Sequence, residues 1–257
     1  MNRQKLEAEL CKFDNKILQK LSIYLYETIP STNQILWELL DRNIPPPIVA
    51  IASQQTAGRG QWGRQWQSHR GGLYLSVAID LNISRPSNAP HLTLLSAWGI
   101  ADTLRRYDIP VGIKWLNDLV LDGRKLGGIK CETHIQQEKI TQAVIGVGLN
   151  WTNPIPEMGI NLKAFLDKIT TLERLSAIAI YGIFLGYERY LTNGIEDLLS
   201  SYLTLLETIG RKVTVNGSPG VVIGVNCYGN LRVRLHSSGA TTEIDLPSGT
   251  INLGYDE

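Results

Sequence analysis

The sequence predicts an α+β body followed by a small all-β domain. Helical and strand-like runs are mixed over the first two hundred residues, whereas only short β-like runs, separated by turn dipeptides, follow Gly210. At 257 residues, the chain is long enough for one sizeable domain with a small appendage. We therefore predict a domain over residues 1–208 and a small barrel over residues 209–257.

The first part of the chain mixes strand and helix patterns. Residues 23–29 are strand-like, and residues 35–40 carry apolar side chains at helical spacing after a proline break and helix-starting residues. Residues 48–52 form a short apolar strand. Apolar residues alternate without interruption over residues 73–81, which predicts a strand with one buried face.

Helical spacing returns at residues 94–104, and strand patterns follow. Residues 111–115 are strand-like, and a turn through Gly123 joins the next two strand candidates before a strand at residues 140–150. Helical patterns then dominate up to Leu206, with an interruption at Asn193-Gly194. Within them, the apolar run from Leu175 to Tyr187 is shorter than the roughly 18 residues that suggest a membrane span, so it predicts a buried core helix.

Composition narrows the class of partner. Twenty-five Lys and Arg residues against 24 Asp and Glu residues leave a net charge of +1, which provides no overall attraction for DNA or an anionic membrane. The N-terminus has no uninterrupted apolar segment, and the three cysteines are far apart. We therefore expect a cytoplasmic protein with reduced thiols. Any anion that it binds must be bound by positive charges gathered at one site.

The first motif is QQTAGRGQWGRQW, residues 54–66, in which three glycines stand beside two arginines. Glycine lets the backbone approach a ligand, and arginine offers a planar fork of donors to an anion. The glycines also fit G-x-G-x-x-G, but the next element is a strand where a dinucleotide site needs a helix. On residue types alone, an anion-binding loop and a solvated surface loop both stay open.

The second motif is KWLNDLVLDGRKLGGI, residues 114–129. If its two strands form a hairpin, Asp118 and Lys125 can approach one another across it. The carboxylate could then carry Mg²⁺ and the ammonium could contact a phosphate; an ordinary surface salt bridge is the alternative. The third motif, GVGLN, ends at Asn150, whose amide could read a base edge or cap a turn.

Taken in order, GRGxxGRxW, GGLYLSV, KWxND, RKLGGI and GVGLN resemble the biotin protein ligases, also called biotin–acetyl-CoA-carboxylase ligases. The resemblance runs from about Tyr26 through the C-terminal strands. It implies a class II synthetase-like mixed sheet, largely antiparallel and flanked by helices, with an SH3-like C-terminal barrel. It also implies that ATP and biotin are substrates, that Mg²⁺ is used, and that biotinyl-5′-AMP is formed before biotin passes to a lysine of a biotin carboxyl carrier protein.

The resemblance implies roles for particular residues. Lys125, Arg64 and Asp118 would be catalytic, and Asp118 would also hold Mg²⁺ and orient or deprotonate the acceptor lysine. The residues implied for biotin are Ser31, Thr32, Asn33, Gln55, Arg59, Gly60, Gln61, Lys125 and Gly128. Those implied for ATP and the adenylate are Arg59, Arg64, Trp66, Asn117, Lys125 and Asn150.

The sequence departs from the family pattern at two positions. Many members have arginine where this chain has Gln61, which removes one positive charge from the loop. We therefore expect weaker retention of the intermediate unless Lys125 and Arg64 compensate. Leu116 replaces the proline of KWPND, and we expect little functional change because Asn117 and Asp118 are kept.

Partners and rival functions follow from the same resemblance. About 22 residues precede the first predicted strand, too few for the N-terminal DNA-binding domain of some family members, so we expect no DNA binding. An exposed edge strand could pair with a second subunit, with the carrier, or with both in alternation. The rivals are a lipoate or octanoate ligase or transferase, and a non-catalytic biotin- or nucleotide-binding regulator.

Overall fold

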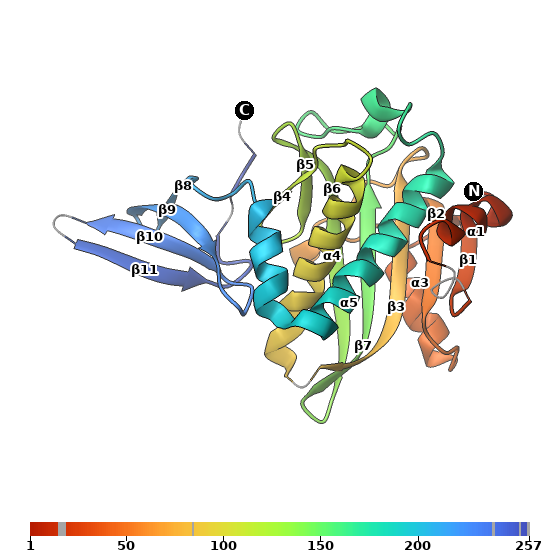
Figure 1. Cartoon of the computed structure of the whole chain (residues 1–257), viewed down its shortest axis with the longest axis horizontal. Coiled ribbons are helices and arrows are strands. Elements are labelled where there is room, and N and C mark those ends of the chain that lie inside the picture. The colour runs from red at the N-terminus through yellow and green to blue at the C-terminus, as the bar shows by residue number, and fades with distance from the viewer. Residues whose placement is uncertain (15–18, 84, 238–239, 252, 256–257) are drawn as a thin grey trace.

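The larger unit of the computed structural model is built on a seven-stranded mixed sheet (Figure 1). The structure describes residues 1–14, 19–83, 85–237, 240–251 and 253–255. The strand order is β1-β2-β3-β7-β6-β5-β4. The bounds are β1 Ser22–Ile29, β2 Ile48–Gln55, β3 Leu73–Ile83, β4 Gly112–Lys114, β5 Asp118–Leu121, β6 Arg124–Gln136 and β7 Lys139–Leu149. Among the paired strands described in this sheet, β1 and β2 run parallel and the other pairs run antiparallel. Helix α3 (Thr32–Asp41) connects β1 to β2 and provides the crossover that a parallel pair requires.

Helices cover both faces of this sheet. Helix α3 packs on one face, and helices α4 (Ala89–Arg105) and α5 (Leu172–Thr204) pack together on the other, where α1 (Arg3–Cys11) contacts α5. Within the described ranges, short 3-10 helices occupy connections at Gln61–Gly63, Pro86–Asn88 and Leu162–Phe165. None of the described helices is both long enough and apolar enough to cross a membrane.

Strand β3 differs from the sequence prediction of one buried face. Leu75 and Val77 belong to the core under α4 and α5, as the alternation predicts. Ser76 and Ala78 on the opposite face are also fully buried, because α3 covers that side. The strand therefore lies at the centre of a three-layer arrangement, and its polar Ser76 must find a hydrogen-bond partner inside.

The C-terminal strands form a second, antiparallel sheet. Its order is β11-β10-β9-β8, with bounds β8 Lys212–Val215, β9 Ser218–Val225, β10 Leu231–Ser237 and β11 Ala240–Leu246. Over the described residues no pairing joins β8 to β11, so the sheet of the predicted small barrel is not closed. The predicted fold class of a helix-flanked mixed sheet with a small β unit is confirmed. The predicted boundary at residue 209 lies between α5 and β8.

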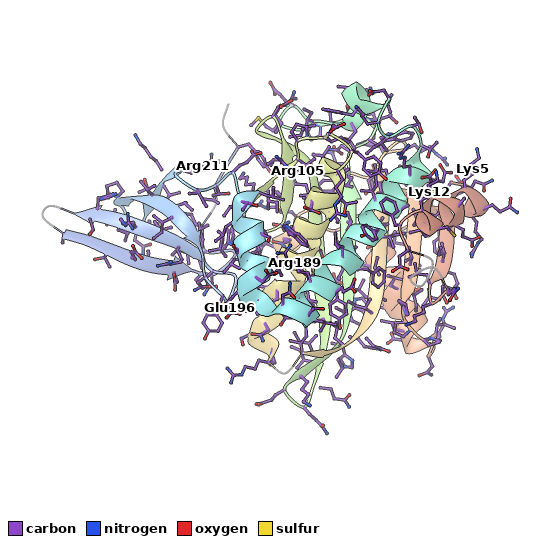
Figure 2. All side chains as sticks on the ribbon, in the orientation of Figure 1. Lys5, Lys12, Arg105, Arg189, Glu196 and Arg211 are labelled. Carbon is purple, nitrogen blue, oxygen red and sulfur yellow. The ribbon has the colours of Figure 1, made fainter. Side chains whose placement is uncertain are left out.

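Specific contacts hold the second sheet against the first unit. Trp115 Nε1 donates to the carbonyl of Gly229 at 3.0 Å, and His91 Nε2 lies 2.7 Å from the carbonyl oxygen of Cys227. Helix α5 bends at Gly194, where φ is 84°, as the sequence predicts. On its N-terminal side lies Arg189, labelled in Figure 2. Its Cζ lies 4.7 Å from the centre of the Trp98 ring on α4.

Helices α4 and α5 cross where glycines replace side chains. A Cβ added to Gly99 would lie 1.9 Å from the carbonyl oxygen of Gly182. We therefore expect Gly99→Ala to lower the free energy of unfolding by about 3 kcal/mol, because overpacking forces the helices apart. Urea denaturation measures this change.

The matched control is Leu191→Ala, which truncates a side chain of α5 that is 63% exposed. It should change the free energy of unfolding by less than about 0.5 kcal/mol. Equal stability of Gly99→Ala and the parent would contradict the close helix crossing.

Candidate active site

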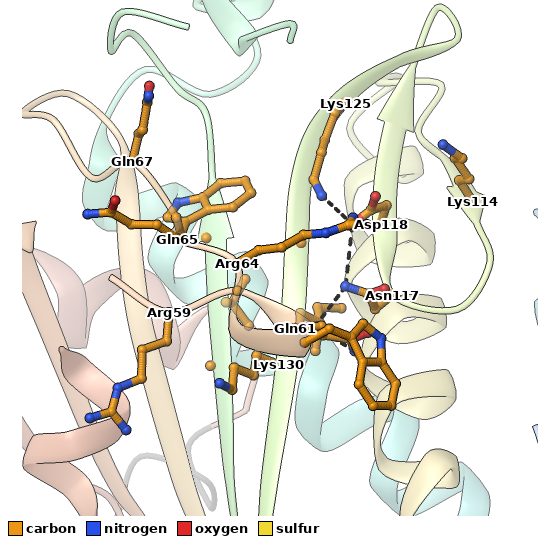
Figure 3. A pocket seen from close by; sticks show the side chains of 18 of the residues that line it. Arg59, Gln61, Arg64, Gln65, Gln67, Lys114, Asn117, Asp118, Lys125 and Lys130 are labelled. Carbon is orange, nitrogen blue, oxygen red and sulfur yellow. Dashed lines mark hydrogen bonds and ion pairs between the residues drawn. The ribbon is translucent and has the colours of Figure 1, made fainter. Parts of the chain in front are cut away.

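A cavity of about 920 Å³ lies at one end of the large sheet, between the Gly-rich loop, the β5–β6 hairpin and the C-terminal segment. Figure 3 shows labelled side chains of the Gly-rich loop and of the β5–β6 hairpin around it, with Arg64 and Lys125 both directed toward Asp118. Every residue that the sequence predicts for the site lies in its lining: Ser31, Thr32, Asn33, Gln55, Arg59, Gly60, Gln61, Arg64, Trp66, Asn117, Asp118, Lys125, Gly128 and Asn150.

The Gly-rich loop is a narrow hairpin over the sheet. Gly60 N donates to the Arg64 carbonyl at 2.6 Å, and Trp66 N donates to the Gly58 carbonyl at 2.9 Å. The chain reverses at Trp62, whose φ is 56° and ψ is 39°. Backbone hydrogen bonds therefore fix the conformation of the loop and the positions of its Cα atoms.

The polar side chains of this loop point in different directions. Arg64 extends toward Asp118 (Figure 3). Arg59 turns away, and its Nη2 donates to Gln34 Oε1 on α3 at 3.3 Å. Gln61 Nε2 donates to the carbonyl of Ile129 on β6 at 3.4 Å, so the residue that replaces arginine connects the loop to the sheet.

The indole of Trp66 lies against strand β7. A Cβ on Gly148 would lie 2.5 Å from Trp66 Nε1, so only glycine leaves room for the ring. The buried Nε1 has no hydrogen-bond partner among the described residues. A buried donor without a partner is costly, so this N–H is suited to an acceptor on a ligand.

The predicted hairpin between β5 and β6 is present, and a β-bulge determines where Lys125 points. Asp118 pairs with Gly128, while Val120 pairs with Lys125 two positions along, so β6 carries one extra residue between them. The extra residue brings Lys125 to the same face as Asp118. Lys125 Nζ consequently lies 2.6 Å from Asp118 Oδ1.

This ion pair sits where ligand can reach it. The side chains of Lys125 and Asp118 are 29% and 15% exposed. Lys125 Nζ also lies 5.5 Å from the centre of the Trp66 ring. Beneath them Gly128 presents no side chain, and a Cβ there would lie 3.3 Å from Asp118 Oδ1.

The Asp118 carboxylate accepts from further donors. Asn117 Nδ2 donates to Oδ1 at 3.3 Å and to the carbonyl of Ile129 at 3.0 Å. The hydroxyl of Tyr255 donates to Oδ2. Burial, with the nearby Asp118 charge, raises the pKa of Tyr255 well above its usual range, so this hydroxyl stays a donor.

A second group of polar residues lies at the start of α3. Gln55 Oε1 accepts from the backbone N–H of Thr32 at 2.8 Å, and Gln55 Nε2 donates to Ser68 Oγ at 2.8 Å. Ser31 occupies the N-cap position, but its side chain makes no capping hydrogen bond. The hydroxyl is therefore not committed to the helix.

Asn33 completes this group. The hydroxyl of Ser76, on the covered face of β3, donates to Asn33 Oδ1 at 2.6 Å. Asn33 Nδ2 is buried and has no partner among the described residues. One end of the amide is therefore held by the protein while the other offers a donor, and Asn33 lines the cavity.

Asn150 lines the cavity, but its amide supports the chain. Its Nδ2 donates to the carbonyls of Ile160, at 3.1 Å, and Lys125, at 3.4 Å. Its Oδ1 accepts from Asn153 at 3.0 Å. These bonds fix the backbone of Lys125, a supporting role that the sequence prediction of base recognition did not include.

Comparison with known proteins shows the family of this chain. Residues 25–150 match the biotin/lipoate A/B protein ligase family. The bifunctional ligase/repressor BirA of Bacillus spizizenii is 31% identical over 221 residues, which cover 80% of this chain and 67% of that protein. The chain belongs to the biotin/lipoate A/B protein ligase family. The family predicted from the motifs is thereby confirmed.

Two further members extend the comparison. The biotin–[acetyl-CoA-carboxylase] ligase of Mycobacterium tuberculosis is 35% identical over 126 residues, 47% of this chain and 45% of that protein. The biotin protein ligase from Aquifex aeolicus, solved with biotin and ATP, has a TM-score of 0.67 and 20% identity. That match covers 87% of this chain and 99% of the other, and it supports the fold assignment.

The cavity of this family member is strongly basic. Among the described residues, its lining holds one acidic side chain, Asp118, and five basic ones: Arg59, Arg64, Lys114, Lys125 and Lys130. Lys130 is paired with Glu132 at 3.3 Å, outside the lining. The near-neutral chain therefore concentrates positive charge in the cavity, which suits an anionic ligand.

Sequence reasoning missed several lining residues. Lys114 is the first residue of the KWLND motif but was given no role. Lys130 lies two positions beyond Gly128 on β6, so the strand period could have found it. Trp62 was quoted within the loop but given no role. The C-terminal residues, including Tyr255, carry no local pattern that marks a site.

The charge of the cavity makes a testable prediction. We expect inorganic pyrophosphate to bind the protein, and Lys125→Gln to weaken this binding by about tenfold, because a partly desolvated cation is lost beside the ligand. Isothermal titration calorimetry at two salt concentrations measures the affinity.

Lys139→Gln is the matched control, since Lys139 is exposed on β7 and does not line the cavity. Its affinity should equal that of the parent. Unchanged pyrophosphate affinity in Lys125→Gln would contradict an anion site at the hairpin.

Proposed function

We propose that this chain is an ATP-dependent biotin protein ligase. It joins biotin to ATP as biotinyl-5′-AMP, releases pyrophosphate, and transfers biotin to a lysine of the biotin carboxyl carrier protein of acetyl-CoA carboxylase. The observation that carries the proposal is the ammonium of Lys125, held between Asp118 and Trp66 in a basic cavity that also contains uncommitted hydrogen-bond donors. Named biotin ligases among its relatives support the same reaction.

The first step brings two anions together. An oxygen of the biotin carboxylate attacks the α-phosphorus of ATP, and the bond to the pyrophosphate oxygen breaks. Lys125 directs one of its three N–H donors to Asp118. The other two can donate to oxygens of the α-phosphate and of the biotin carboxylate. Arg64, which extends toward the same point, adds positive charge where negative charge gathers.

The polar group at the start of α3 is suited to the ureido ring of biotin. That ring carries a carbonyl acceptor and two N–H donors. Asn33 Nδ2 offers a buried donor that has no partner in the described part of the chain, and the Ser31 hydroxyl makes no capping hydrogen bond to the helix. Thr32 and Gln55 are held in place by their own hydrogen bond.

These polar groups also bear on the rival substrate. Lipoate carries an apolar dithiolane ring in place of the ureido ring, so it would leave the Asn33 donor buried without an acceptor. An unsatisfied buried donor costs about 1–3 kcal/mol. Biotin is therefore the better fit, although the family includes lipoate enzymes.

Magnesium would enter with ATP. Asp118 is the only carboxylate in the described cavity lining, and no cluster of three or more His, Cys, Asp or Glu among the described residues could hold a metal ion by itself. A carboxylate has about four acceptor sites, and Lys125, Asn117 and Tyr255 take three. This donor set fits Mg²⁺ held by one carboxylate and the phosphates, where it would neutralise phosphate charge.

The second step transfers the biotinyl group. The neutral ε-amine of the carrier lysine attacks the acyl carbon of the mixed anhydride, and AMP leaves. Because a free lysine has a pKa of about 10.4, the amine needs a group that accepts its proton. Asp118 is the candidate, since it is the only acidic side chain in the described lining.

Three sequence predictions accompany this proposal without further test. They are a cytoplasmic location, the lack of DNA binding and the pairing of an edge strand with a second subunit or the carrier. Strands β1 and β4 are the edges of the large sheet. The reduced retention expected from Gln61 likewise stays a prediction.

Intact mass spectrometry tests the function. The protein is incubated with ATP, Mg²⁺, a biotin carboxyl carrier domain and either biotin or lipoate. We expect the carrier to gain the mass of one biotinyl group in the biotin arm, and this gain to fall at least about a hundredfold in rate in Lys125→Ala, because the charge at the reacting phosphate is lost.

Lys139→Ala and a carrier whose acceptor lysine is arginine serve as controls. The first should label at the parent rate, and the second should not be labelled. A lipoyl increment without a biotinyl one would favour the rival substrate, and no increment with either acid would refute the ligase function.

A further inference from the structure

The C-terminal end of the chain forms one wall of the cavity. Ser248, Gly249, Thr250 and Ile251 line it, as do Leu253, Gly254 and Tyr255. We call residues 248–251 and 253–255 the C-terminal strap. The strap follows β11 and lies beside Asp118, although Tyr255 is 137 residues further along the chain.

Side chains of β4 and β5 fasten the end of the strap. The Tyr255 hydroxyl donates to Asp118 Oδ2, and Lys114 Nζ lies 3.3 Å from the centre of the Tyr255 ring. Lys114 Nζ also donates to the carbonyl of Gly254. Leu253 is buried in the main core, so the strap is anchored by apolar contact as well as by charge.

The strap also meets the Gly-rich loop. Gly249 has a φ of 91°, and a Cβ there would lie 2.8 Å from the ring of Trp62. Trp62 is otherwise largely exposed. The loop and the strap therefore lie close together at Trp62 and Gly249, and both line the cavity.

We propose that the C-terminal strap covers the adenylate end of the cavity and retains the activated intermediate, with Tyr255 as the positioning residue that fastens it to Asp118. This inference rests on the proposed ligase function. A mixed anhydride is hydrolysed by water, so a site that makes one must keep it enclosed until the carrier lysine arrives.

The fastening also arranges the charges beneath it. Tyr255 and Asn117 donate to Asp118, which offsets part of the carboxylate charge beside Lys125. The other donors of Lys125 then remain available to the ligand. Because Gln61 replaces the arginine of many family members, the loop has one fewer positive charge to retain the intermediate. The strap then supplies a contact that helps to retain it.

Release of preformed intermediate tests the strap. Protein is loaded with biotin and radiolabelled ATP, freed of excess ligand, and followed for loss of biotinyl-AMP. Tyr255→Phe keeps the ring over Lys114 but lacks the hydroxyl, and it should lose the intermediate about tenfold faster because a hydrogen bond to a charged group is gone. Tyr255→Ala should be about threefold faster again, since the ring contact with Lys114 also disappears.

Two further variants distinguish loss of the strap contact from a general loss of structure. Tyr228→Phe changes an exposed tyrosine of the C-terminal unit that does not line the cavity, and its release rate should equal that of the parent. Lys114→Gln should release faster than the parent, which tests the fastening without altering Tyr255. Thermal unfolding midpoints verify that each variant is folded.

The outcomes distinguish this inference from the ligase function. If the parent forms no biotinyl-AMP, the ligase function fails. If the parent forms it and all variants release it at the parent rate, the strap inference alone is overturned. Faster adenylate formation in Tyr255→Phe with unchanged release would also overturn it, because Tyr255 would then obstruct Asp118.

Discussion

The contact between Lys125 and Asp118 is the interaction on which the rest of the site depends. An ammonium and a carboxylate 2.6 Å apart hold each other at the floor of a basic cavity. The contact requires the bulge in β6, because strand residues three positions apart otherwise lie on opposite faces. It also requires Gly128 beneath the pair and the bonds of Asn150 that fix the Lys125 backbone.

The neighbouring structure follows from the need to keep these charges near a ligand but away from bulk water. The Gly-rich loop brings Trp66 over β7, where Gly148 leaves room for it, and directs Arg64 toward the pair. The start of α3 supplies an uncommitted donor at Asn33. One sheet supports these features, because the Gly-rich loop follows β2, helix α3 follows β1, and Asp118 and Lys125 lie on β5 and β6 of the same sheet.

The strand and helix periods predicted most of the fold, and the turn at Gly123 predicted the approach of Asp118 to Lys125. The burial of Ser76 on β3 was not predictable from alternation, which identifies one face but not what covers the other. The role of Asn150 in supporting Lys125 depends on a loop whose path no local pattern records. Tyr255 escaped notice for the same reason, because it lies 137 residues from its partner.

A double-mutant cycle on Asp118→Asn and Lys125→Gln tests the coupling most directly, with the rate of pyrophosphate release from ATP and biotin as the measurement. Residues that act as one unit show strongly non-additive effects. We expect the double variant to be about as slow as Lys125→Gln alone. If the double variant lost the product of the two single rate losses, the proposed coupling would be contradicted, because the two side chains would then act independently.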